Sequence, residues 1–194
     1  MLKNSLLILL SLIVAIGGGA GSVWYALAEQ HAVGSVNIGA WETFPDIGTP
    51  DSDPYSRARI ARAGVLTLGR AEGLAFVARR DSGGNALRRE CRYAIEGTFP
   101  AARFWTLYAG DTDLYPLDAN SPRTAALHSN EMLRLADNSI TLSVGMPPSP
   151  GNWLPVSGTG PLALVLTLYD TPIAGDVGGS DIQLPQVLSV GCDA

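Results

Sequence analysis

The sequence contains few charged residues of either sign and almost no lysine. Charged residues make up 16% of the 194 residues, 13 of them basic and 18 acidic, and Lys3 is the only lysine. A chain that is 46% hydrophobic with so little charge does not have the composition of a disordered protein. It also has no basic excess and no basic run, which are the electrostatic footprint of nucleic-acid binding. We therefore expect one folded domain and no nucleic-acid partner.

Residue sets that carry common catalytic or metal chemistry are scarce as well. His31 and His128 are the only histidines, and there is no G-x-S-x-G elbow for a serine nucleophile. The sequence also lacks an H-x-x-x-H pair, a cysteine cluster and a phosphate-binding loop that ends in lysine. These absences predict no metal ion and no cofactor, and they favour a protein that is not an enzyme.

Carboxylates leave one catalytic alternative open. Asp111, Asp113 and Asp118 lie close together in one predicted loop. Paired carboxylates cleave glycosides and oxygen clusters hold calcium, but aspartate is also a routine turn residue. The alternative to a binding protein is therefore an envelope hydrolase that acts on a glycoside or ester through an Asp cluster or His128.

Residues 5–28 form a long run without charge. As an α-helix this run would be about 36 Å long, which is enough to cross a hydrocarbon core of about 30 Å. Lys3 precedes the run and Glu29 follows it, so the positive-inside rule leaves residues 1–4 in the cytoplasm. We therefore expect a transmembrane helix that exports the rest of the chain.

The exported part divides into a tether and a domain. We expect the tether over residues 29–34 and a β-rich extracytoplasmic domain over residues 35–194. A signal peptide cleaved after Ala28 is the alternative to an anchor, although the apolar run is longer than the seven to fifteen residues or so of a signal core. Both interpretations place the domain outside the cytoplasm.

Two glycines inside the apolar run have the spacing of a helix-pairing motif. Gly17 and Gly21 form a G-x-x-x-G pattern, which lets two transmembrane helices approach closely. Glycine is also common in membrane spans generally. The sequence thus predicts the lipid bilayer as the partner of residues 5–28, with a weak homodimer through the two glycines as a secondary hypothesis.

Cys91 and Cys192 are the only cysteines. In an oxidising compartment two lone cysteines most simply pair with each other, and two buried thiols or a metal site are the alternatives. Tyr93 and Ile95 share one side of a predicted strand with Cys91. We therefore predict a Cys91–Cys192 disulfide that fastens the carboxyl-terminal segment to a strand.

After residue 64 the hydrophobic pattern has the period of two that is typical of β-strands. A hairpin turn at residues 81–85 is expected to join the first two strands. The many short strands and turns predict a mainly β fold, an antiparallel jelly-roll-like β-sandwich with one or two short helices. The predicted strands cover residues 74–80, 90–96, 102–108, 139–145 and 161–170, with a further one near 187–190.

The helices are predicted from capping residues. Asp53 as N-cap, Pro54 at the first position and Gly64 as a left-handed terminator predict a helix over residues 54–63. Ser129 is expected to cap one short helical turn over 130–134.

Four side chains are candidate ligand-binding residues. Trp41 and Trp153 carry ring faces against which a sugar can stack, although core packing is the usual role of tryptophan. Arg79 and Arg89 belong to a group of arginines that flanks the predicted hairpin and suits an anionic envelope polymer. A charged strand edge that resists aggregation is the alternative role of these arginines.

Five motifs follow one another along the chain: GTPDSDPY from Gly48 with Arg57, EGL from Glu72 with Phe76, ARFWTLY from Ala102, NWLP from Asn152, and LVLTLYDTP from Leu164. Together they cover about residues 35–175 and resemble the bacterial domain-of-unknown-function 1214 (DUF1214) family. The resemblance implies a jelly-roll β-sandwich in a short, membrane-anchored form found in the bacterial envelope. Thr167 departs from the pattern, which often has arginine there. The family has no settled activity, so the resemblance implies none.

These observations predict a single-pass protein of the bacterial cell membrane, with its amino terminus in the cytoplasm and its domain in the periplasm or otherwise outside. We expect this domain to be non-catalytic and to bind a partner protein or a glycan.

Overall fold

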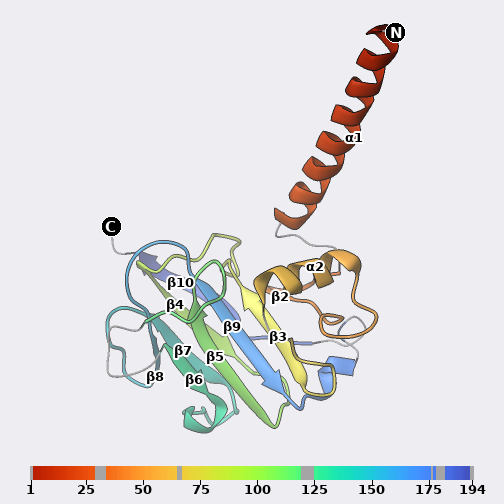
Figure 1. The fold of residues 1–194 in the computed structure, drawn as a ribbon. Helices are drawn as coiled ribbons and strands as arrows, with labels where there is room; N and C mark the ends of the chain where they lie inside the picture. Colours follow the sequence, from red (N-terminus) through yellow and green to blue (C-terminus); the bar gives the residue numbers. More distant parts are fainter. Residues whose placement is uncertain are drawn as a thin grey trace.

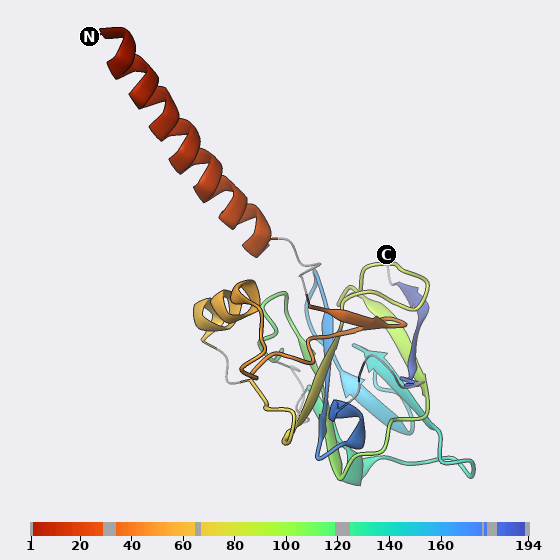
Figure 2. The same ribbon diagram turned by 90° about the vertical axis from the view of Figure 1, so that its right-hand side faces the viewer.

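The structure is a computed structural model that describes residues 2–28, 34–64, 67–118, 125–175, 177 and 182–192. A long helix stands apart from two β-sheets, which face each other as a sandwich (Figures 1 and 2). In the described ranges the elements are α1 Leu2–Ala28, β1 Val36–Ile38, β2 Trp41–Thr43, α2 Pro54–Ala63, β3 Gly73–Ala78, β4 Cys91–Gly97, β5 Phe104–Gly110, β6 Ala126–His128, β7 Ile140–Gly145, β8 Asn152–Pro155, β9 Ala163–Tyr169 and β10 Gln186–Cys192, with short 3-10 helices η1 Ser129–Glu131 and η2 Pro172–Gly175.

The larger sheet has six strands in the order β1-β2-β3-β9-β5-β6. Its central strand β9 is buried on both faces from Ala163 to Leu168, which confirms the expectation from its continuous apolar run. β9 runs antiparallel to both neighbours, so that Leu166 lies opposite Phe76 on β3 and Leu107 on β5. This strand therefore connects the two halves of the sheet.

The smaller sheet has four strands in the order β10-β4-β7-β8. Its first three strands pair antiparallel, whereas β7 and β8 pair in parallel. β10 places Cys192 directly opposite Cys91 on β4, with 3.9 Å between the two Cα atoms and a bond between the sulfur atoms. The predicted disulfide is confirmed.

One hydrophobic core fills the space between the sheets (Figure 2). Phe76 and Leu166 contribute to it from the six-stranded sheet, and Ile95 and Leu142 from the four-stranded sheet. All four side chains are 0% exposed, and each contributes about 1.5–3 kcal/mol by leaving water. The mainly β sandwich predicted from the alternating pattern is confirmed, while its jelly-roll connectivity stays a prediction.

The helix α2 begins and ends where its capping residues predict. The Asp53 carboxylate accepts hydrogen bonds from the amides of Tyr55 and Ser56 at 2.9 and 3.0 Å. Gly64 adopts the left-handed conformation, with a φ of 63°, and its N–H donates to the Ile60 carbonyl. Any residue with a Cβ would be strained at such a φ, so this glycine ends the helix.

Two local predictions need correction. The turn at residues 81–85 forms, and Arg80 pairs antiparallel with Ala86 across it. The strands β3 and β4 belong to different sheets, however, so the predicted hairpin of these two strands does not form. The helical turn predicted over 130–134 is a 3-10 helix at Ser129–Glu131. Ser129 does not cap it, because its hydroxyl accepts a hydrogen bond from the Trp105 amide.

The long helix α1 makes almost no packing contact with the sandwich. Its span from Lys3 to Tyr25 is long and apolar enough to cross a membrane, and none of it is buried against the protein. Leu6, Ile16 and Trp24 are each at least 66% exposed. The described part of the chain therefore has one amino-terminal helix whose apolar surface is not covered by the protein itself.

Candidate functional site

One end of the sandwich is rich in arginine, and we call it the arginine end. It comprises residues 79–92, the loop 111–118 after β5 and the segment 157–162 before β9. Here the chain crosses from β3 in one sheet to β4 in the other. The Leu87 amide donates to the Arg79 carbonyl at 2.9 Å, and the Leu162 amide donates to the Leu87 carbonyl at 3.0 Å. The crossing segment is therefore fixed to both β3 and β9.

A buried carboxylate shapes the turn at the start of this crossing. Asp81 is 5% exposed and accepts hydrogen bonds from the amides of Gly83 and Asn85 at 2.9 and 2.8 Å. The Asn85 side-chain amide donates to it as well, at 3.1 Å. Burial acts to raise the pKa of Asp81, but these hydrogen bonds outweigh it and hold the pKa below its ordinary value.

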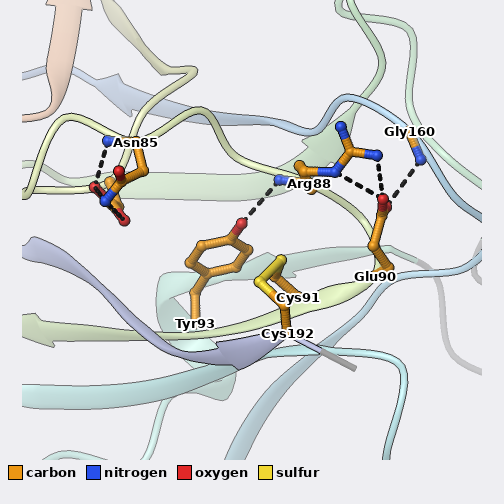
Figure 3. Close-up of a disulfide and its surroundings, with 8 residues drawn as sticks. Asn85, Arg88, Glu90, Cys91, Tyr93, Gly160 and Cys192 are labelled. Carbon is orange, nitrogen blue, oxygen red and sulfur yellow. Dashed lines mark hydrogen bonds and ion pairs between the residues drawn. A yellow bond between two sulfur atoms is a disulfide. The ribbon is translucent and has the colours of Figure 1, made fainter. Parts of the chain in front are cut away.

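A second carboxylate ties the crossing segment to the start of β9 (Figure 3). Glu90 accepts hydrogen bonds from the Gly160 amide at 2.9 Å and from Arg88 Nε at 2.7 Å, with a further contact from the Arg88 Nη2 atom. The backbone hydrogen bond from Gly160 is the largest cause that lowers the pKa of Glu90 from 4.5 to about 2. The Arg88 amide in turn donates to the Tyr93 hydroxyl at 2.8 Å, beside the disulfide.

A pocket of about 170 Å³ opens between these segments. Arg79 and Arg80 line one side, at the end of β3, while Thr112 comes from the loop after β5 and Pro161 from the segment before β9. The Arg79 Nε atom is buried and has no hydrogen-bond partner among the residues that the structure describes. Because a buried donor without an acceptor costs free energy, this atom marks a place where an acceptor is missing.

The charge of Arg79 gives the pocket its chemistry. Burial lowers the pKa of the guanidinium, and the negative charge of Glu42 on the neighbouring strand β2 acts to raise it. An arginine nevertheless stays protonated at any physiological pH, so the pocket presents a fixed positive charge. A planar guanidinium pairs well with carboxylate, phosphate or sulfate oxygens. The pocket therefore has the chemistry of an anion-binding site.

The other arginines of this end surround the pocket. Arg80 is exposed and donates from Nη1 to the Gly84 carbonyl at 2.9 Å. Arg89 donates from Nε to the Pro161 carbonyl at 2.9 Å, so it lies on one of the residues that line the pocket. The two arginines that the sequence singles out thus both lie near Pro161, since Arg79 lines the pocket with it and Arg89 donates to its carbonyl.

The two tryptophans do not join this site. Trp41 is 1% exposed in the core, and its indole N–H donates to the Pro185 carbonyl at 2.7 Å. Its ring face is therefore not open to a sugar, and its place among the candidate binding residues is corrected to core packing. Trp153 lies half-buried on β8, at the edge of the other sheet, where its N–H donates to the Gly145 carbonyl at 3.0 Å.

His128 lies on the edge strand β6, and it is not among the residues that line the pocket. Its Nε2 atom lies 2.8 Å from the Glu131 carboxylate, and its ring packs 5.6 Å from that of Phe104. Its Nδ1 atom is buried without a hydrogen-bond partner in the described part of the chain. The neighbouring Ser129 hydroxyl already accepts the Trp105 amide, so it is not arranged as a nucleophile for this histidine.

The aspartates of the loop after β5 have structural partners. The Asp111 carboxylate accepts the amides of Asp113 and Tyr115 at 2.9 and 3.0 Å, as in an Asx-turn. The Asp118 backbone carbonyl accepts the Ser157 hydroxyl. Within the described ranges, no group of three or more His, Cys, Asp or Glu side chains is placed to hold a metal ion. His31 lies outside the described residues.

A family described as a protein of unknown function, DUF1214, matches residues 72–173, which is more than half of the chain. The chain belongs to the DUF1214 family. The match confirms the resemblance seen in the sequence, but over a narrower range than residues 35–175. The motif that begins at Gly48 lies outside the matched range.

Two solved structures resemble this DUF1214 chain. The VPA0106 protein from Vibrio parahaemolyticus has a TM-score of 0.56 and 20% identity, with 72% of this chain and 36% of that chain covered. A putative uncharacterized protein from Burkholderia cenocepacia has a TM-score of 0.41 and 18% identity, with 75% and 44% covered. The first likeness supports the fold alone, and this chain spans well under half of either protein. No curated protein matches the sequence.

Several residues of the DUF1214 motifs hold the fold together. A Cβ at Gly73 would lie 2.1 Å from the Leu168 carbonyl oxygen, so only glycine lets β3 pair with β9 at this level. Asn152 is 8% exposed and bridges three backbone groups, since it accepts the Leu133 amide and donates to the carbonyls of Leu133 and Thr141. These motif residues thus have structural roles.

Sequence reasoning missed the part of the pocket that comes from distant segments. Thr112, Pro161 and Leu162 line it, but nothing in their local sequence indicates a site. The one available signal was the row of arginines from Arg79 to Arg92, because such a charged cluster in a lightly charged chain is unusual.

Proposed function

We propose that this DUF1214 chain is a membrane-anchored binding domain of the bacterial envelope that binds a partner protein or a glycan, and that its Arg79 pocket takes up an anionic group. The observation that supports the anion is that Arg79 lines a pocket of about 170 Å³ and that its Nε atom lacks an acceptor among the described residues.

The exposed surface of α1 supports the anchor. Side chains such as Leu7, Leu10 and Ile13 are 50–60% exposed although nothing in them can hydrogen-bond with water. Leaving such area in water costs about 25 cal/mol per Å², whereas a lipid bilayer covers it. Insertion of α1 therefore removes the penalty. A signal peptide cleaved after Ala28 would place the same domain on the same side, but free of the membrane.

The disulfide supports a place outside the cytoplasm. Disulfides form and persist in oxidising compartments such as the periplasm, and cytosolic thiols are kept reduced. The Cys91–Cys192 bond joins residues 101 apart in the sequence, so it constrains more than half of the chain. The positive-inside rule gives the same orientation, because Lys3 precedes the apolar helix.

The hydrolase alternative has less support. Asp111 serves as a turn residue and Asp53 as a helix cap, so neither carboxylate is free of a structural role. His128 pairs with Glu131 on an edge strand, and it does not line the Arg79 pocket. A weak homodimer through Gly17 and Gly21 stays a prediction.

Anion binding is tested on the full chain in a neutral detergent. Titration calorimetry with inorganic phosphate, sulfate and a uronic-acid oligosaccharide should detect binding to the wild type. Arg79→Gln should weaken it about tenfold or more, because a hydrogen bond to a charged group is worth about 1.5–3 kcal/mol.

Arg103→Gln is the matched control. Arg103 is an exposed arginine beside the start of β5, where it pairs with Asp170 at 2.9 Å, and its loss should leave anion affinity unchanged. Wild-type protein that binds none of the three anions, or an Arg79→Gln variant that binds them equally well, would refute the proposed site.

The anchor is tested separately by fractionation. After an alkaline salt wash the intact chain should remain in the membrane pellet. A soluble product that begins at Glu29 would show cleavage instead and would contradict the anchor.

A further inference from the structure

The position of the arginine end relative to α1 indicates which kind of anion the pocket binds. Both views of the fold place α1 on the same side of the sandwich as the carboxyl terminus and the end of β10 (Figures 1 and 2). The loops that line the pocket lie at this end, because β3 and β5 finish here and β9 begins here. The segments that line the pocket thus lie on the side of the domain from which the helix leaves.

The length of the tether sets how far this end can be from a bilayer. Six residue steps separate Ala28, the last residue of α1, from Gly34, the first described residue of the domain. Even a fully extended chain of that length spans only about 21 Å. When α1 crosses a membrane, the near side of the domain is therefore held within reach of the lipid headgroups.

The side chains exposed at the arginine end suit such a surface. Arg88 has a side chain that is 56% exposed, and Arg80 is exposed as well. Tyr115, in the loop after β5, is 64% exposed, and Val190, near the end of β10, is 61% exposed. Arginine pairs with lipid phosphates, and tyrosine is enriched where protein meets the headgroups.

Acidic side chains oppose a purely electrostatic attraction at this end. Asp111 and Asp113 flank Thr112, one of the residues that line the pocket. Glu90 is neutralised locally by its contact with Arg88. A diffuse positive field is therefore weak here, and an anion must be recognised by direct contact inside the pocket.

We propose that the Arg79 pocket binds the phosphate of an anionic phospholipid in the same bilayer that α1 crosses, so that the arginine end rests on the membrane. This inference rests on the proposed anion site and names its source. The guanidinium of Arg79 pairs with a phosphate oxygen in the pocket, and Arg80 reaches a second oxygen from the rim. Lipid binding would fix the orientation of the domain and leave the opposite end free for a partner.

The test uses the full chain in lipid nanodiscs and hydrogen–deuterium exchange. One set of discs contains phosphatidylcholine alone, and the other also contains phosphatidylglycerol. Amides of residues 79–90 and 111–118 should exchange more slowly in the anionic discs. Raising the salt concentration should weaken this protection, because salt screens the attraction between the arginines and the lipid phosphates.

Four variants assign the protection to the pocket. Arg79→Gln should abolish it, and Arg80→Gln, an exposed change that leaves the core intact, should reduce it. Arg103→Gln should retain it. Asp113→Asn should strengthen it, because it removes a negative charge beside Thr112 while the Asp111 turn stays in place.

The outcomes separate this inference from the function on which it rests. Equal exchange in the two kinds of disc, together with Arg79-dependent binding of phosphate or the oligosaccharide in detergent, would overturn the lipid ligand and retain the anion site. Equal exchange without any anion binding would overturn both. Protection that persists in Arg79→Gln would also overturn the inference, since it would place the lipid contact elsewhere.

Discussion

The two ends of the sandwich are stabilised in different ways. At the arginine end a disulfide, the buried Asp81 and the Glu90–Arg88 contact hold the crossing segment. At the opposite end neutral hydrogen bonds do the same work: Asn152 bridges backbone groups and the Thr171 hydroxyl donates to the Ala101 carbonyl at 2.7 Å. The far end also has an ion pair, Arg103 with Asp170, but both side chains are exposed. Its more buried side-chain hydrogen bonds come from an amide and a hydroxyl, whereas the arginine end uses the buried carboxylate of Asp81.

This difference shows what the arginine end gains from its charges. Carboxylates that accept backbone amides there fix the loops around the pocket without using Arg79. Arg79 is therefore left with a donor that the protein does not satisfy, while the surrounding framework is rigid. An end held by neutral groups alone would offer no such fixed charge to a ligand.

Among the changes that test this difference between the two ends, removing the disulfide should lower the free energy of unfolding the most. The double variant Cys91→Ser with Cys192→Ser should lose about 2–5 kcal/mol of the free energy of unfolding, because the bond closes a loop of 101 residues in the unfolded chain. Denaturant melts of the full chain measure this loss. Reductant should lower the stability of the wild type and leave the variant unaffected; equal stability of the two proteins would show that the arginine end does not need its covalent link.

Asn152→Ala tests the opposite end. It should lower the free energy of unfolding by about 2–3 kcal/mol, because it leaves the amide of Leu133 and two carbonyls without partners in a buried place. Asn37→Ala on the edge strand β1 is the control, since Asn37 is exposed. A small loss for Asn152→Ala would mean that neutral hydrogen bonds are not what stabilises this end.

Glu90 gives the arginine end a dependence on pH. Its pKa is lower in the folded state, about 2 against an ordinary 4.5, so the stability it contributes is present above pH 4.5 and is lost as the pH falls toward 2. Melts of Glu90→Gln across this range should show a flatter acid slope than those of the wild type. Identical slopes would indicate that Glu90 is not held by Gly160 and Arg88 in solution.

Chelators should have the smallest effect, because the Asp111 carboxylate accepts two backbone amides and, within the described ranges, no three acidic groups are placed to hold a metal ion. The melting temperature of the purified full chain should be the same with and without a calcium chelator. A lower melting temperature that calcium restores would contradict this and would indicate an ion among Asp111, Asp113 and Asp118.

Local patterns were the reliable part of the sequence. Asp53 and Gly64 fix the ends of α2 because their effects act within one helical turn, and the alternation around Cys91 and Ile140 gives the buried face of each strand. The error at residues 81–85 has the opposite cause. A turn signal shows that the chain reverses there, but it does not show to which sheet the next strand belongs.

For the same reason, only part of the candidate site could be predicted from the sequence. The cluster of arginines is visible in the sequence, but Pro161 and Thr112 reach Arg79 only through the pairing of β3, β9 and β5. Trp41 could not be distinguished from an exposed tryptophan, because the Pro185 carbonyl that receives its N–H lies 144 residues away.

The sequence by itself determined the apolar amino-terminal helix, the alternation of the strands and the pair of cysteines, since each depends on neighbouring residues or on the scarcity of a residue type. Only the tertiary structure decided which strands share a sheet, which arginine has a buried nitrogen without an acceptor and which tryptophan lies in the core. Those properties come from contacts between segments far apart in the chain, where the free energy of packing, and not local preference, selects the partner.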